Sequence, residues 1–182
     1  MTAWPGREIA AERVLDVIGH NPMRHFYLID GVLRMDRDLV EALERCLAAP
    51  LRAEIDDIDD LLAWLVGCEY VHDWRQFPTD DVWVRPDDFE RTRRGDCEDH
   101  ALYAWTWLTR MGLEARLVFG SRDGDEHAID HAWVALHVDD RWLLVEPTSK
   151  AIDTMVRPLD SVAAYAPRWS VDATLVFYEH LR

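Results

Sequence analysis

The sequence predicts an α+β protein in which one helix packs on an antiparallel sheet and further helices precede it. Apolar residues recur at helical spacing through the first 71 residues, and alternating runs follow an amphipathic helix that begins near residue 97. Helices that precede a meander of strands are typical of the α+β class. We therefore expect an N-terminal helical extension over residues 1–72, packed on a core formed by residues 73–182.

Composition argues against two classes of partner. Of the 182 residues, 49% are apolar, which is enough to bury a core, and the net charge of −15 opposes binding to nucleic acid or to an anionic membrane surface. The longest apolar run, residues 61–68, is too short to cross a bilayer. The acidic balance suits a soluble protein whose peptide or protein substrate is cationic or neutral.

Cysteine usage indicates a reducing compartment. Cys46 and Cys68 lie in apolar helical patterns and are expected to be buried free thiols, while Cys97 stands at the start of another helix. No basic and apolar leader begins the sequence. We expect a cytoplasmic protein, or a periplasmic one if a leader was removed before residue 1.

Three helices are predicted in the N-terminal extension. Residues 7–18, 36–49 and 55–71 carry apolar side chains at helical spacing, and Asp36 is a candidate cap for the second of these helices. The segment between the first two helices, residues 21–33, is expected to be irregular or to form a short pair of strands.

Residues 72–94 are expected to form a long ordered loop. Pro78 and Pro86 interrupt regular structure, and several aspartates surround them. Four aromatic residues in the same stretch, among them Trp83, argue against disorder. Loops of this length in compact domains are usually functional when they are ordered.

The rest of the chain predicts the most regular helix and a sheet. Residues 97–112 place apolar side chains on one face, and Gly112 is expected to end this helix. Three strands, a short helix and a last strand are predicted after it, at residues 115–120, 131–138, 141–145, 159–164 and 174–178.

Cys97 stands where a thiol can become a nucleophile. It follows Gly95 and Asp96, and because Asp96 is a candidate N-cap, Cys97 occupies the first helical position. Free backbone N–H groups and the helix dipole favour the thiolate there, and the same N–H groups can bind a developing oxyanion. Asp96, Glu98 and Asp99 oppose this by raising the thiol pKa, unless a histidine cation or a bound cation offsets their charge. The structural alternative is a buried helix cysteine with acidic capping residues.

His131 and Glu146 are predicted to meet on a hairpin. Residues 139–140 separate two alternating runs as a two-residue turn, and this register sets Trp133 opposite Glu146. His131 is then a diagonal neighbour of Glu146 on the same face, about 7–8 Å away at the backbone. Such a carboxylate can fix the imidazole tautomer and stabilise the imidazolium. The structural alternative is an edge histidine hydrogen-bonded to a structural glutamate.

These residues resemble the transglutaminase-like cysteine-enzyme superfamily, and in particular its bacterial branch of transglutaminase-like cysteine proteinases, the LapG-like proteases. The resemblance covers Trp74 to Thr148. Its strongest part joins a Trp-x-x-Pro segment at Trp83 to the Gly-Asp-Cys-Glu-Asp motif at residues 95–99. The spacing of His131 and Glu146 is also similar.

The resemblance implies a papain-like core in which a nucleophile helix packs on an antiparallel sheet. It implies Cys97 as the nucleophile, His131 as general base and acid, and Glu146 as the acid that orients the imidazole. Trp83 resembles an aromatic residue of the active-site wall. The family more often has Asp in the third position, so the longer Glu146 requires an adjusted geometry.

The resemblance also implies a calcium site, although the cysteine chemistry requires no cofactor. In LapG-like members, acidic residues that flank the cysteine bind calcium, so Asp96 and Glu98 are candidate ligands and Asp99 is considered beside them. Hard carboxylate oxygens suit calcium. The alternative gives these residues the roles of helix cap and surface charge.

The leading functional hypothesis is a cysteine hydrolase or acyltransferase that acts on a peptide or a Gln-like amide through a thioester. The alternative is an inactive descendant that binds a peptide in the same groove, lined by Trp83 and Trp133. A metal-binding structural protein is disfavoured, because Cys97 and His100 form one C-x-x-H pair without a second.

Overall fold

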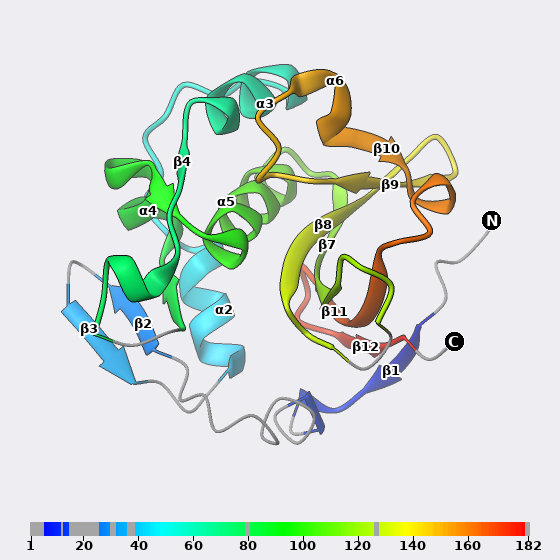
Figure 1. Ribbon diagram of the computed structural model, residues 1–182, viewed down its shortest axis with the longest axis horizontal. Helices are drawn as coiled ribbons and strands as arrows, with labels where there is room; N and C mark the ends of the chain where they lie inside the picture. Colours follow the sequence, from blue (N-terminus) through cyan, green and yellow to red (C-terminus); the bar gives the residue numbers. More distant parts are fainter. Residues whose placement is uncertain are drawn as a thin grey trace.

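A seven-stranded antiparallel sheet forms one half of the protein, and helices form the other half (Figure 1). The computed structural model describes residues 6–11, 13–14, 26–29, 32–35, 39–78, 81–125 and 128–180. In spatial order, the strands of the sheet are β1 (Arg7–Ile9), β12 (Phe177–Glu179), β11 (Ala166–Asp172), β7 (Glu114–Ser121), β8 (His131–Val138), β9 (Arg141–Val145) and β10 (Val156–Pro158). The predicted α+β class is confirmed.

Helices and two small sheets make up the other half. The helices are α2 (Leu39–Leu47), α3 (Ile58–Val66), α4 (Pro86–Thr92), α5 (Cys97–Arg110) and the short α6 (Ile152–Met155), with 3-10 turns η1 (Asp73–Arg75) and η2 (Leu159–Ser161). One small sheet has the order β3 (Val32–Met35), β2 (Phe26–Ile29) and β5 (Val82–Val84), and the other pairs β4 (Glu69–Tyr70) with β6 (Arg94–Gly95). β2 and β4, which precede residue 73, therefore pair with strands that follow it.

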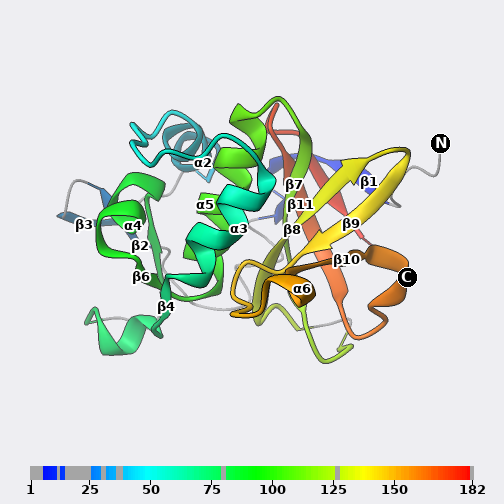
Figure 2. The same cartoon turned by 90° about the horizontal axis from the view of Figure 1, so that it is seen from above.

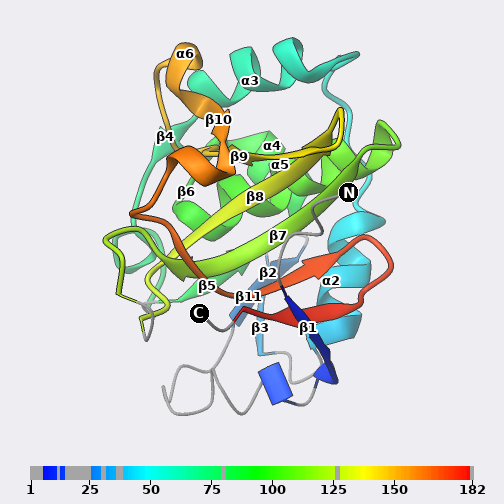
Figure 3. The ribbon, with the colours of Figure 1, turned by 90° about the vertical axis from the view of Figure 1, so that its right-hand side faces the viewer.

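Helix α5 is the centre of the larger core. It packs on β7 and β8 and is surrounded by α2, α3 and α4 (Figures 2 and 3). Its buried side chains include Trp105 and Leu108, which are fully enclosed. A smaller core covers the opposite face of the sheet, where Trp133 packs with Val162 and Tyr165. The sheet thus carries a helix on one face and the segment of residues 159–165 on the other.

The predicted helix over residues 7–18 is wrong at its start. Residues 7–9 form β1, which pairs with β12 along a regular antiparallel register, and an Arg7–Glu179 ion pair of 2.5 Å lies beside it. Pairing to a distant strand overrides a local helical pattern here. Much of the remaining prediction, residues 15–18, lies outside the described residues, as does the predicted cap Asp36.

The second and third predicted helices are confirmed, with shorter bounds. α3 begins after Asp57, whose side chain accepts a hydrogen bond from the Asp60 N–H at 2.9 Å, and it ends at Gly67. Residues 69–70, predicted to be helical, instead form β4. A strand pair between the first two predicted helices is present as β2 and β3.

The long loop predicted for residues 72–94 is wrong, because β5, α4 and β6 lie within it. Pro86 occupies the first turn of α4 together with Asp87 and Asp88, which is a regular helix-start signal. Arg93 ends the helix in the left-handed conformation, with φ of 53°.

The strands predicted at 115–120, 131–138 and 141–145 are confirmed as β7, β8 and β9. The Asp139-Asp140 turn has positive φ at both residues, 49° and 60°, which matches the twist of a tight hairpin. β11 and the β10 edge strand were not predicted, and the last strand lies at 177–179 instead of 174–178. The helix expected at 159–164 is the 3-10 turn η2. None of the described helices is both long and apolar enough to span a membrane.

Candidate active site

Asp99 fixes the backbone around the start of α5. Its carboxylate is fully buried and accepts hydrogen bonds from the Val84 N–H at 2.7 Å and the Asp96 N–H at 3.2 Å. Gly95 is needed beside it, since a Cβ there would collide with the Asp99 carboxyl group. Asp99 therefore ties β5 to the helix start and holds Cys97 in place.

The Cys97 thiol is half-buried between three chain segments. It donates to the Glu98 Oε2 at 3.2 Å, and the Ala132 backbone N–H of β8 and the Tyr70 hydroxyl lie near the sulfur. Burial, followed by the charge of Asp96, raises the pKa of Cys97 to about 12. Burial and the charge of Asp96 thus outweigh the effect of the helix start on the thiol pKa.

His131 and Glu146 are in direct contact, as their predicted positions required. The His131 Nε2 lies 2.7 Å from the Glu146 Oε2, and the Tyr165 hydroxyl donates to the same oxygen at 2.7 Å. Thr148 donates to the other oxygen from its N–H at 3.1 Å and its hydroxyl at 2.5 Å. Burial alone would raise the pKa of Glu146, but the hydrogen bond and charge of His131, with the donors of Thr148 and Tyr165, lower it from 4.5 to about 2.

The backbone at the end of β9 accommodates the side chain of Glu146, which is one methylene longer than the aspartate more common in the family. The hairpin register continues as predicted to Val134 opposite Val145. Glu146 then leaves the ladder with β8, and its N–H bonds to the Met155 carbonyl at 2.7 Å. The predicted Trp133–Glu146 pairing is therefore not made by the ladder, yet the Glu146 side chain still reaches His131.

No hydrogen bond joins the Cys97 sulfur to the His131 ring within the described structure. The two residues are brought together through the β8 backbone, because the sulfur contacts the N–H of Ala132, the next residue after His131. The His131 Nε2 is occupied by Glu146, and the Nδ1 makes no hydrogen bond to any described residue. This nitrogen can therefore receive a proton once the thiol turns towards it.

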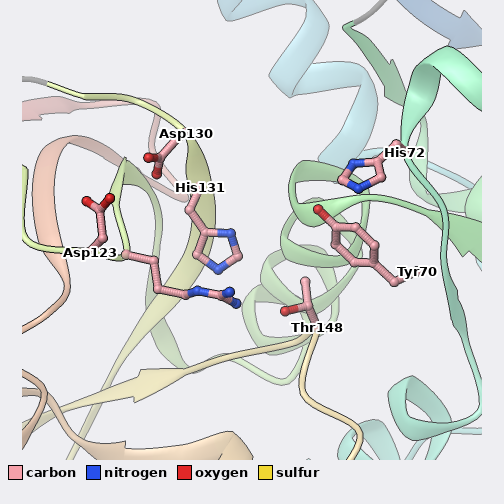
Figure 4. Close-up of a pocket in the computed structure, with 7 residues that line it drawn as sticks. Tyr70, His72, Asp123, Asp130, His131 and Thr148 are labelled. Carbon is pink, nitrogen blue, oxygen red and sulfur yellow. The ribbon is translucent and has the colours of Figure 1, made fainter.

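A cavity of about 650 Å³ opens beside His131. His131, Asp130 and Asp123 lie on one side of it, Tyr70 and His72 lie on the other, and Thr148 lies between them (Figure 4). Arg122 also lines the cavity.

Trp83 and Trp133, the predicted substrate contacts, do not line this cavity. Trp83 is 4% exposed and stacks on Phe119 with ring centroids 5.0 Å apart, and Trp133 is fully enclosed against Tyr165. Both rings bury large apolar surfaces in the two cores, which stabilises the fold. The aromatic groove expected from them is replaced in this structure by the cavity between Tyr70 and His131.

An acidic cluster lies under the start of α5. Asp73, Asp81 and Glu98 each place an oxygen within 4.8 Å of the others, and Asp73, Asp96 and Asp99 form a second such group. Burial raises the pKa of Asp73 to about 8 and raises the pKa of Asp96, Glu98 and Asp99 as well. Burial thus favours the protonated, uncharged form of these carboxyl groups.

Two carboxylate oxygens of this cluster indicate that the site suits a cation. The Oδ1 of Asp73 and the Oδ1 of Asp96 are buried and have no hydrogen-bond partner in the described structure. Orphaned carboxylate oxygens next to further carboxylates form a hard-oxygen donor set that suits calcium. Asp96 and Glu98, the predicted ligands, belong to this set, whereas both Asp99 oxygens accept backbone hydrogen bonds.

His100 has a structural role near the site. Its Nδ1 lies 2.7 Å from the Asp96 carbonyl, and Lys150 donates to its Nε2 at 3.4 Å. Burial lowers the pKa of His100 to about 4, so the ring is neutral and donates from Nδ1. His100 thus joins the helix start to the segment after Glu146, and the C-x-x-H pair is not a ligand pair.

The residues of the site that were not found from the sequence include Tyr70, Asp73, Asp81, Thr148 and Tyr165. Thr148 had a usable signal, because it follows Glu146 by two residues. Tyr70 was assigned to a helix, and Tyr165 approaches Glu146 only through the tertiary fold.

The family model of the Transglutaminase-like superfamily matches residues 41–147, which is more than half of the chain. This chain belongs to the transglutaminase-like superfamily. The superfamily predicted from the Gly-Asp-Cys-Glu-Asp motif is therefore confirmed. No curated protein gives a sequence match to the chain.

Solved structures support the same transglutaminase-like fold. EGTA-treated LapG from Legionella pneumophila has a TM-score of 0.53 at 15% identity, over 78% of this chain and 75% of that chain. Calcium-bound LapG from the same organism also has a TM-score of 0.53 at 15% identity, over 79% of this chain and 89% of that chain. At this identity the likeness shows a shared fold, which confirms the papain-like core predicted for the LapG-like branch.

Proposed function

We propose that the protein is a cysteine hydrolase or acyltransferase that acts on a peptide or a Gln-like amide. The observation that carries this proposal is the junction of α5 and β8, where the Cys97 sulfur contacts the residue next to His131. His131 is in turn bonded to a glutamate that receives two further side-chain donors, from Thr148 and Tyr165. A buried carboxylate held by so many donors serves to orient an imidazole and to stabilise its cation.

In this proposal the Cys97 sulfur attacks the substrate carbonyl carbon, and its proton passes to the His131 Nδ1. The carbonyl π electrons move to oxygen, and the free N–H groups at the start of α5 stabilise the oxyanion. When the carbon–oxygen double bond re-forms, the carbon–nitrogen bond breaks, and His131 protonates the leaving amine. Water, or a second amine, then attacks the thioester and returns the proton to the thiol by way of His131.

The acidic cluster supports calcium as a cofactor of the same site. Asp73, Asp81, Asp96 and Glu98 would hold the cation. When bound, it would supply positive charge beside Cys97 and so lower the thiol pKa, which Asp96 now raises. LapG from Legionella pneumophila has a calcium-bound structure, which accords with this proposal.

The alternative is a catalytically inactive protein that binds a peptide in the cavity beside His131. One observation favours it: the Cys97 thiol has a raised pKa and bonds to Glu98 instead of to His131. This arrangement describes a resting thiol, and a protein that kept it permanently would bind without reacting.

Reaction with p-nitrophenyl acetate in the presence of calcium separates the two functions. We expect release of p-nitrophenolate and acetylation at Cys97, detected by mass spectrometry. Cys97→Ala should reduce the rate to that of solution, and His131→Ala should reduce it by about 10²–10⁴-fold. Cys46→Ala is the control, since Cys46 is buried in the core and should leave the rate unchanged. Equal rates for wild type and Cys97→Ala would refute the proposal.

A further inference from the structure

Strand pairing brings Tyr70 to the start of α5. β4 and β6 are parallel, Tyr70 pairs with Gly95, and the Val71 N–H donates to the Gly95 carbonyl at 2.9 Å. Gly95 precedes Cys97 by two residues, so this short ladder places the Tyr70 side chain beside the thiol. The ladder joins two backbone segments that are far apart in the sequence, so no local sequence pattern predicts that Tyr70 lies beside Cys97.

The Tyr70 hydroxyl is a donor beside the reacting sulfur. It lies near the Cys97 sulfur, close enough for the two groups to affect each other's ionisation. Neighbouring rings hold the phenol in place: His72 lies edge-on with centroids 5.2 Å apart, and His100 lies nearly parallel at 6.1 Å. Burial, followed by the charge of Cys97, raises the pKa of Tyr70, so the phenol keeps its proton as a donor.

Tyr70 also borders the route to the thiol. Tyr70 and His131 line the cavity and face each other across it (Figure 4), whereas Cys97 is not among the described residues that line it. Tyr70 is 39% exposed, and the Cys97 sulfur lies near it. A carbonyl group that reaches Cys97 from this cavity therefore meets the Tyr70 hydroxyl as it arrives.

We propose that Tyr70 is a catalytic residue that donates its hydroxyl to the carbonyl oxygen of the substrate as Cys97 attacks the carbonyl carbon. This inference deepens the proposed function and rests on it. In the resting site the Tyr70 hydroxyl lies near the sulfur. When a lone pair forms the sulfur–carbon bond, negative charge moves to the carbonyl oxygen, and the Tyr70 O–H turns to that stronger acceptor without losing its proton. Collapse of the intermediate expels the leaving group, and the hydroxyl returns to the sulfur after the thioester is hydrolysed.

If Tyr70 only covered the Cys97 thiol, a different result would be expected. A phenol that only shields the thiol would slow every reagent that attacks it. A donor to the oxyanion assists acyl transfer, which creates negative charge on oxygen, but gives no such assistance to alkylation by iodoacetamide, where the thiolate displaces iodide at a saturated carbon. The ratio of the two rates therefore distinguishes the roles.

The test compares wild type with Tyr70→Phe, which keeps the ring and its contacts with His72 and His100. Each protein is treated with p-nitrophenyl acetate and, separately, with iodoacetamide, and modification of Cys97 is followed by mass spectrometry. We expect the ratio of acylation rate to alkylation rate to fall by about 10²–10³-fold in Tyr70→Phe. Tyr178→Phe is the matched control, because Tyr178 donates to Asp172 at 2.9 Å outside the cavity and should leave the ratio unchanged.

Protection of the buried thiols Cys46 and Cys68 from iodoacetamide reports that each variant is folded. An unchanged ratio in Tyr70→Phe overturns the inference while wild-type acylation at Cys97 upholds the proposed function. If wild type itself is not acylated at Cys97, the proposed function fails and the inference fails with it. Faster alkylation together with faster acylation in Tyr70→Phe would assign the covering role and overturn the donor role.

Discussion

Replacement of Glu146 by Gln tests whether this carboxylate is ionised and bonded in the folded protein. Its side chain is 6% exposed, and its pKa is lowered from 4.5 to about 2. A lowering of this size corresponds to about 3 kcal/mol of stability, at about 1.4 kcal/mol for each pH unit. Because the folded pKa is the lower one, this contribution is fully present above pH 4.5 and is lost as the pH falls towards 2.

Urea unfolding of wild type and Glu146→Gln, measured from pH 7 down to pH 3, follows this contribution. We expect Glu146→Gln to lower the free energy of unfolding by up to about 3 kcal/mol at neutral pH, and the difference should shrink steadily below pH 4.5. Glu114→Gln is a matched control, because Glu114 bonds to His137 at 2.8 Å but its side chain is 57% exposed. Water screens that exposed pair, so the control should change stability by less than about 1 kcal/mol.

Two outcomes would refute this reasoning. If Glu146→Gln and Glu114→Gln lower stability equally, burial and the donors around Glu146 do not strengthen its contact with His131. If the loss in Glu146→Gln is independent of pH, the carboxylate is not the titrating group, and the substitution acts through packing alone.

Calcium and the hairpin turn give two further tests. Because burial raises the pKa of Asp73 to about 8, and raises that of Asp96 and Glu98, the stability of the calcium-free protein should fall as the pH rises towards 8. Calcium should therefore raise the melting temperature more at pH 8 than at pH 5, as measured by differential scanning fluorimetry, and no difference between calcium and EGTA at pH 8 would contradict a site. Asp140 has a φ of 60°, a conformation that glycine adopts more easily than aspartate. We therefore expect Asp140→Gly to raise the free energy of unfolding in urea by about 0.5–1 kcal/mol. A lower free energy of unfolding would show that the backbone conformation of Asp140 does not limit stability.

Local patterns were sufficient for the central elements of the fold. The helix that begins at Cys97 and the strands at 131–138 and 141–145 follow from helical and alternating periodicity, which depend only on neighbouring residues. The two-residue turn also set the hairpin register correctly as far as Val145, and although Glu146 then leaves the ladder, its side chain still reaches His131.

The N-terminal strand and the environment of the thiol could not be predicted in this way. β1 looks helical in isolation and becomes a strand because β12 offers it a ladder of backbone hydrogen bonds. The thiol pKa depends on how deeply Asp96 and its neighbours are buried, and a list of charges along the chain contains no burial. The core position of Trp83 likewise follows from a stacking partner, Phe119, on a distant strand.

Periodicity along the chain is enough to establish a cysteine at a helix start, a histidine at the start of a strand and a glutamate within reach of it. The fold adds Tyr70 on the thiol, Asp73 in the acidic cluster and Tyr165 on the glutamate. Tyr70 is positioned by the β4–β6 ladder, and Asp73 lies in a 3-10 turn. Tyr165 belongs to the segment that covers the far face of the sheet. These positions depend on how segments that are distant in the sequence pack together. The periodicity of consecutive residues contains no information about that packing.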